Sequence, residues 1–201
     1  MANTKIEQAI AVLHRWKEIS ILGNGTLLIC HVPHVAPEAW LHILYKGLGA
    51  NEMAEYETRF PVKFPNAYRE FLRMANGVNI FSDSTAVWGY RESYIRKGET
   101  AYQPYDLLLL NQERPRGCPD SWLFFGSYSW GRGSDVHFDT SLGVDNSEVF
   151  RTARDSTTIL NKWSSFNDWF VTEVERLANL FDENGKKKNP QEPTIPSSTF
   201  P

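Results

Sequence analysis

The hydrophobic pattern changes its period near Gly77, and this change restricts the possible folds more than any other feature of the sequence. Before it, "FPNAYREFLRMANG" (residues 64–77) predicts a helix with Pro65 in its first turn and a left-handed glycine cap at Gly77. The apolar stripe of this helix is formed by Tyr68, Phe71, Leu72 and Ala75. After Gly77 come six short segments typical of strands: 78–81, 85–90, 106–110, 122–128, 134–140 and 147–152.

The segments around these strands are mostly helical. Thr4 and Glu7 form a capping box for a first helix, and Ser165 with Asp168 begins a last helix that we expect to end at Gly185. Between the first helix and residue 64 we expect a strand over 26–32, a helix from Pro37 to Gly47 or Gly49, and an acidic helix around 51–60. Helices that come before and after a run of consecutive strands in the sequence predict an α+β domain with a mainly antiparallel sheet of about six strands.

Size and charge exclude several classes of protein. A chain of 201 residues can bury one core, so we expect a single domain over 1–183, followed by a mobile, proline-rich tail over 184–201. The net charge of −3, from 21 basic and 24 acidic residues, does not favour binding to nucleic acid. No segment has the pattern of a signal peptide or a membrane span, so we expect a cytoplasmic protein without membrane contact.

The segment "FGSYSWGRGSDVHFD" (residues 125–139) is the strongest candidate for chemistry. Its glycines do not match a phosphate-binding loop, and a strand rather than a helix follows them. Asp135, His137 and Asp139 alternate with apolar residues, but same-face neighbours on a strand lie about 7 Å apart, so a second element would be needed to complete a metal site. We favour a strand with one face in the core and one in water. The sequence predicts no catalytic residues, no metal site and no cofactor.

Other reactive side chains also have ordinary structural explanations. The spacing of Cys30 and Cys118 indicates structural thiols, and a proline separates His31 from His34. The acidic residues around 52–57 are typical of a solvated helix surface.

Taken together, the motifs resemble the SUKH superfamily, the Smi/Knr-like domain, over about residues 55–181. The similarity lies in two sets of residues: Pro65, Tyr68, Phe71, Leu72, Asn76 and Gly77, and then Gly126, Gly133, Asp139 and Gly143. The resemblance implies a curved, mainly antiparallel sheet and no catalytic residues. Three segments depart from the family pattern: an N-terminal extension over about 1–50, a long loop over 91–105, and the tail.

The resemblance also implies a function of binding. Many bacterial members resemble immunity proteins that neutralise a cognate polymorphic or contact-dependent toxin, often a nuclease, and this is the function we expect. Eukaryotic relatives resemble scaffold regulators of cell-wall synthesis, so a regulatory scaffold is the alternative. A metal enzyme or hydrolase built on Asp135, His137 and Asp139 is the third hypothesis.

Binding to a protein partner favours tryptophan, tyrosine and arginine, which bury a large area and also form hydrogen bonds. Trp130 and Arg132 are the first candidates because they lie between glycines in a predicted turn. The other predicted partner-binding residues are Trp88, Tyr90, Tyr102, Tyr128 and Asp135. The partner is then a toxin or another protein, and the oligomeric state is left open.

Overall fold

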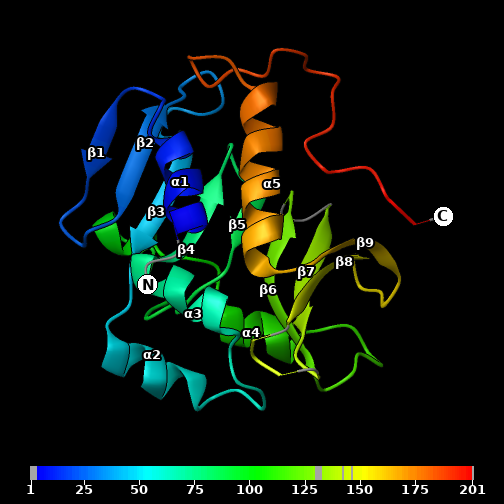
Figure 1. The fold of residues 1–201 in the computed structure, drawn as a ribbon. Helices are drawn as coiled ribbons and strands as arrows, with labels where there is room; N and C mark the ends of the chain where they lie inside the picture. The colour runs from blue at the N-terminus through cyan, green and yellow to red at the C-terminus, as the bar shows by residue number, and fades with distance from the viewer. Residues whose placement is uncertain (1–3, 130–132, 142, 146, 201) are drawn as a thin grey trace.

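The computed structural model describes residues 4–129, 133–141, 143–145 and 147–200. Over these residues the chain forms one antiparallel sheet of nine strands in sequential order, with β1 and β9 at its two edges (Figure 1). The strands are β1 (Ile19–Ile21), β2 (Leu27–His31), β3 (Trp40–Lys46), β4 (Ala75–Ile80), β5 (Thr85–Val87), β6 (Trp122–Tyr128), β7 (Ser134–Asp139), β8 (Glu148–Ala153) and β9 (Ile159–Trp163). The helices are α1 (Thr4–Leu13), α2 (Ala50–Glu57), α3 (Asn66–Met74), α4 (Leu107–Gln112) and α5 (Phe166–Leu180), with a short 3-10 turn, η1 (Gly98–Ala101).

The α+β class is therefore confirmed, but the expectation of about six strands is wrong. The predicted helix from Pro37 is instead β3, which pairs with β2 on one side and β4 on the other. Most of β3 is buried, including the neighbouring pairs Leu41 with His42 and Leu44 with Tyr45. A strand that is covered on both faces loses the alternation of polar and apolar residues by which strands are recognised. The short edge strands β1 and β9 were not predicted.

The predicted strand over 106–110 is helix α4. The carboxylate of Asp106 accepts hydrogen bonds from the backbone N–H groups of Leu108 and Leu109, and this cap starts the helix. A run of four leucines has no periodicity that separates a strand from a buried helix. Helix α3 is shorter than predicted, because it ends at Met74. Gly77 has the left-handed backbone that was expected (φ +86°), but it lies inside β4.

The helices α1, α3 and α5 pack on one face of the sheet and enclose the main core (Figure 1). Tyr68 of α3 is fully buried at the centre of this core. Its ring lies within about 6 Å, between centroids, of Phe64, Phe125, Phe138 and Phe166. Ser165 caps α5 as predicted, since its hydroxyl accepts from the backbone N–H of Asp168 at 3.2 Å.

The Asn76–Gly77 pair fixes the segment that follows β5. The Asn76 amide donates to the carbonyl of Tyr90 and accepts from its N–H, both at 2.7 Å. Gly89 has to be glycine because a Cβ there would lie 2.4 Å from the Asn76 carbonyl oxygen. The Tyr68 hydroxyl donates to the carbonyl of Trp88 at 2.7 Å. These bonds set the positions of Trp88 and Tyr90, which were predicted to bind a partner.

The long loop and the N-terminal extension contact each other. The Asn24 N–H, in the turn between β1 and β2, donates to the Glu99 carboxylate at 3.0 Å, and its side-chain amide donates to the Glu99 carbonyl. Glu99 belongs to η1, in the middle of the 91–105 loop. Two of the segments that depart from the family pattern are thus joined in the structure.

The C-terminal segment lies along β9 and α5 and is bonded to both. The Thr199 N–H donates to the carbonyl of Leu160 at 2.9 Å, and the Asn161 amide donates to the carbonyl of Ser197 at 2.9 Å. Arg176 of α5 donates to the carbonyl of Thr194 at 2.6 Å. The segment expected to be a mobile tail therefore covers the β9 edge of the sheet.

Deleting residues 194–201 should lower the free energy of unfolding by about 1–3 kcal/mol, because it leaves partly buried donors of Arg176 and Asn161 without acceptors. Chemical denaturation of the full chain and the deletion measures this difference. Deleting only residues 200 and 201 keeps these bonds and is the control. An unchanged stability after the longer deletion would instead support a mobile tail.

Candidate partner-binding site

The structure divides the predicted partner-binding residues between two hollows. Trp88, Tyr128 and Asp135 line the first, which we call the hairpin pocket because β6 and β7 form much of its wall. Tyr90 and Tyr102 line the second, which we call the tyrosine hollow. Trp130 and Arg132, the two foremost candidates, lie outside the described residues.

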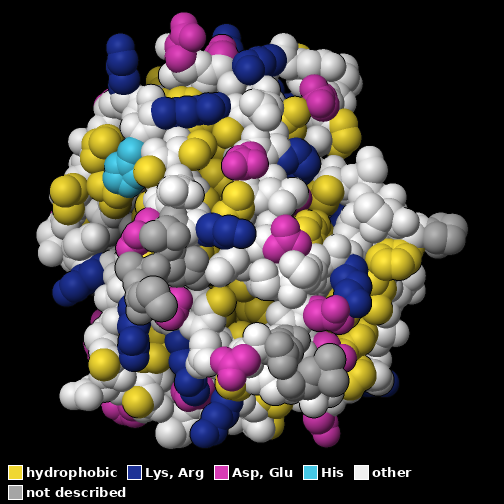
Figure 2. Space-filling view, viewed as in Figure 1, with side chains coloured by type: hydrophobic (Ala, Val, Ile, Leu, Met, Phe, Trp, Pro, Cys, Tyr) yellow, Lys and Arg dark blue, Asp and Glu magenta, His cyan; other side chains and the backbone are white. Residues whose placement is uncertain are grey.

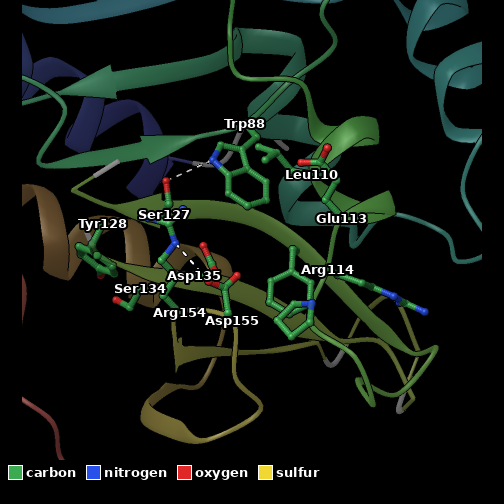
Figure 3. A pocket seen from close by; sticks show the side chains of 13 residues that line it. Trp88, Leu110, Glu113, Arg114, Ser127, Tyr128, Ser134, Asp135, Arg154 and Asp155 are labelled. Atoms are coloured by element: carbon green, nitrogen blue, oxygen red, sulfur yellow. Dashed lines mark hydrogen bonds and ion pairs between the residues drawn. The ribbon is translucent and has the colours of Figure 1, made fainter. Parts of the chain in front are cut away.

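The hairpin pocket has a volume of about 180 Å³ (Figure 3). It opens between the end of α4, strands β6 and β7, and the turn after β8. Its lining residues are Trp88, Leu110, Glu113, Arg114, Pro115, Phe124, Ser127, Tyr128, Gly133, Ser134, Asp135, Arg154 and Asp155. The sequence analysis missed the charged rim, Glu113, Arg114, Arg154 and Asp155, because nothing in their local pattern distinguishes them from ordinary surface charges.

The aromatic residues of this pocket are held from within the core. Trp88 is 3 % exposed, and its indole N–H donates to the Ser127 hydroxyl at 3.3 Å. Tyr128 is fully buried, and its hydroxyl accepts from the Trp169 indole of α5 at 2.8 Å. Trp88 therefore forms the rigid base of the pocket, whereas the Tyr128 ring is directed toward α5 and the charged side chains form the rim.

Asp135 has the most perturbed electrostatic environment in the pocket. Burial, reinforced by the nearby Asp155 carboxylate and opposed by Arg154, raises the pKa of Asp135 to about 6. In the β-sheet register Asp135 lies between Ser127 on β6 and Thr152 on β8, and directly paired residues share a face of the sheet. No hydrogen bond to the Asp135 carboxylate occurs among the described residues.

His137 does not face water, and the expectation that this side of β7 is solvated is wrong at this position. The ring is fully buried and stacks on Trp122, with 4.0 Å between centroids, and on Phe150 on the neighbouring strand. Burial lowers the pKa of His137 to about 3, although the Asp139 carboxylate acts in the opposite direction. Asp139 accepts a hydrogen bond from the N–H of Ser141 at the strand end. Within the described ranges, no three His, Cys, Asp or Glu side chains are placed to hold a metal ion.

The tyrosine hollow is larger, with a volume of about 450 Å³, and is lined by α2, the end of β3 and the 91–105 loop. Four tyrosines contribute to it: Tyr45, Tyr56, Tyr90 and Tyr102. The Arg59 guanidinium lies over the rings of Tyr56 and Tyr90, 5.8 and 5.7 Å from their centroids. An arginine stacked on tyrosines is typical of the centre of a protein interface.

The face of the molecule that carries α1 and α5 has no large patch of positive or negative charge. Figure 2 shows basic and acidic side chains interspersed over this face. No helix in the described part of the chain combines the length and the apolar character needed to cross a lipid bilayer.

A single antiparallel sheet with α1, α3 and α5 on one face, and small surface hollows lined by aromatic and charged residues, defines an α+β binding domain. The chain matches the model of the SMI1 / KNR4 family (SUKH-1) over residues 47–172, more than half of its length, and it belongs to this family. Proteins of this family are generally non-enzymatic immunity or scaffold proteins whose domains bind partner proteins. A search of the curated proteins found no match.

Proposed function

We propose that this protein is a non-enzymatic immunity protein that acts in the cytoplasm by binding and neutralising a cognate bacterial toxin. The observation that carries the proposal is the family match over residues 47–172, which includes every residue of the hairpin pocket. The tyrosine hollow places Tyr90, Tyr102 and Arg59 at the surface, as interfaces with proteins do. A nuclease is the toxin class that we propose first.

Co-expression with the toxins encoded beside it tests this function. The full chain should restore growth of cells that express its cognate toxin, and a tagged full chain should capture that toxin. At the rim of the pocket, Asp155 is 83 % exposed, so Asp155→Lys should weaken capture without unfolding the protein. Glu183→Lys makes the same charge change outside both hollows and should leave capture unchanged. If the chain protects against none of the neighbouring toxins, the proposal is refuted.

The family match equally supports the alternative of a regulatory scaffold for cellular proteins, such as those of cell-wall synthesis. In that case deletion of the gene should cause a growth or morphology phenotype in cells that encounter no toxin. An immunity protein should show no such phenotype, so the two functions separate in one deletion strain.

A further inference from the structure

We propose that the hairpin pocket receives a lysine or arginine side chain of the partner, held between the carboxylate of Asp135 and the ring of Trp88. This inference rests on the proposed function of protein binding and names the chemistry that the partner presents. It is carried by the shape of the pocket, by the charges that line it, and by a second unsatisfied polar group beside Asp135.

The size of the pocket suits one side chain. Its volume of about 180 Å³ lies below the roughly 300–1,000 Å³ typical of sites for small molecules. One wall is apolar, formed by Leu110, Phe124 and the Trp88 ring, and Figure 3 shows the carboxyl groups of Asp135 and Asp155 across from that ring. The aliphatic stem of a lysine or arginine can pack on such a wall while its charged end reaches the acids.

The basic residues of the rim, Arg114 and Arg154, make their closest polar contacts with groups other than Asp135. The Arg114 guanidinium donates to Asp120 at 2.7 Å and to the Trp122 carbonyl at 3.2 Å, so it is directed away from the pocket (Figure 3). Arg154 lies 3.5 Å from Asp155. Within the part of the chain that the structure describes, no basic side chain forms an ion pair with Asp135.

A second polar group beside Asp135 lacks a partner. Thr152 lies directly opposite Asp135 in the register, on the same face of the sheet, and is fully buried. Its hydroxyl oxygen has no hydrogen-bond partner among the described residues. A guanidinium or ammonium group bound to Asp135 brings several N–H donors to this region, whereas an apolar side chain would bury the carboxylate without compensation.

The affinity for the cationic group should depend on pH, because only the ionised form of Asp135 attracts it. The charged groups that face Asp135 are Asp155 and Arg154 from the turn after β8, and Glu113 and Arg114 from the end of α4. Since the pKa of Asp135 is about 6, binding should strengthen between pH 5 and pH 7.

Titration of the full chain with N-acetyl-arginine methylamide tests the proposal, with the Trp88 indole N–H resonance as the NMR readout. N-acetyl-citrulline methylamide, a neutral molecule of similar shape, is the control probe. The arginine probe should shift the Trp88 signal saturably, and the citrulline probe should not. Asp135→Asn should weaken binding about tenfold or more, because a charge-assisted bond is lost. Glu70→Gln removes an exposed charge on α3 and should change nothing.

Equal shifts with both probes, no saturable shift up to the solubility of the arginine probe, or unchanged binding by Asp135→Asn would each overturn the inference. None of these results depends on a toxin. They therefore leave the co-expression test of the immunity function intact, and failure of that test does not affect the binding of the probe.

Discussion

Replacing Tyr68 with alanine should lower the free energy of unfolding by about 3–5 kcal/mol, as expected when a large buried aromatic side chain is removed. Tyr68 is fully buried and joins α3 to β6, β7 and α5 through its contacts with Phe125, Phe138 and Phe166. Because domains are stable by only about 5–15 kcal/mol, this one change should leave the protein marginally folded.

The ring and the hydroxyl of Tyr68 contribute separately, and Tyr68→Phe distinguishes them. This substitution keeps the packing but leaves the Trp88 carbonyl without its 2.7 Å hydrogen bond, which should cost about 1–2 kcal/mol. Denaturation by urea measures both variants. Ile95→Ala, at a side chain that is 66 % exposed, is the control and should change stability by less than about 0.5 kcal/mol. If Tyr68→Ala lowers stability by no more than the Ile95→Ala control does, the central position of Tyr68 in the core is contradicted.

Acid should destabilise the protein through two buried histidines, and His137→Phe should remove part of this sensitivity. Burial lowers the pKa of both His42 and His137 to about 3, whereas a histidine in the unfolded chain titrates near 6.5. Between these values the unfolded state binds more protons, so the free energy of unfolding falls as the pH decreases from about 6.5 toward 3. At pH 4 each histidine should account for a loss on the order of 3 kcal/mol.

Asp135 acts in the opposite direction, since its pKa of about 6 lies above that of an unfolded aspartate and the folded state takes up its proton first. This contribution is common to the wild type and the variant and cancels in their comparison. His137 is the better position to change because the His42 ring also accepts a hydrogen bond from the Phe81 N–H.

The measurement is chemical denaturation at pH 7 and pH 4. His137→Phe should be at least as stable as the wild type at pH 7, because both ring nitrogens of His137 are buried without partners among the described residues. The difference in free energy of unfolding between His137→Phe and the wild type should be larger at pH 4 than at pH 7, by roughly 3 kcal/mol in favour of the variant. Phe150→Leu disturbs the same stack without removing a titrating group, so its effect should be equal at both pH values. An equal difference between His137→Phe and the wild type at both pH values would show that His137 does not titrate in this range.

Much of the central fold was predictable because local signals agreed with one another. The stripe of α3, the Ser165 cap of α5, the strand-like composition of β6 and β8 and the alternation in β7 each indicated the correct element. The predictions failed where the hydrophobic pattern has no period. In β3 this is because both faces of the strand are buried, and in α4 because the sequence is a uniform run of leucines. The edge strands β1 and β9 are too short to carry a pattern, and their conformation depends on pairing with β2 and β8.

The candidate site shows the same division. The pattern of aromatic and acidic residues identified Trp88, Tyr128 and Asp135, and the structure brings these three together in one pocket. The sequence could not indicate that Tyr90 and Tyr102 line a different hollow, because the Asn76 amide and the contact between Glu99 and Asn24 decide where these segments lie.

The α+β class, the family and the central elements α3, β6, β7, β8 and α5 were determined by the sequence alone, because periodicity, caps and motif residues act over a few neighbouring positions. The burial of His137, the unneutralised carboxylate of Asp135 and the position of the C-terminal segment on β9 were decided only by the tertiary structure. Each depends on desolvation and on partners many residues away, which no local pattern can encode.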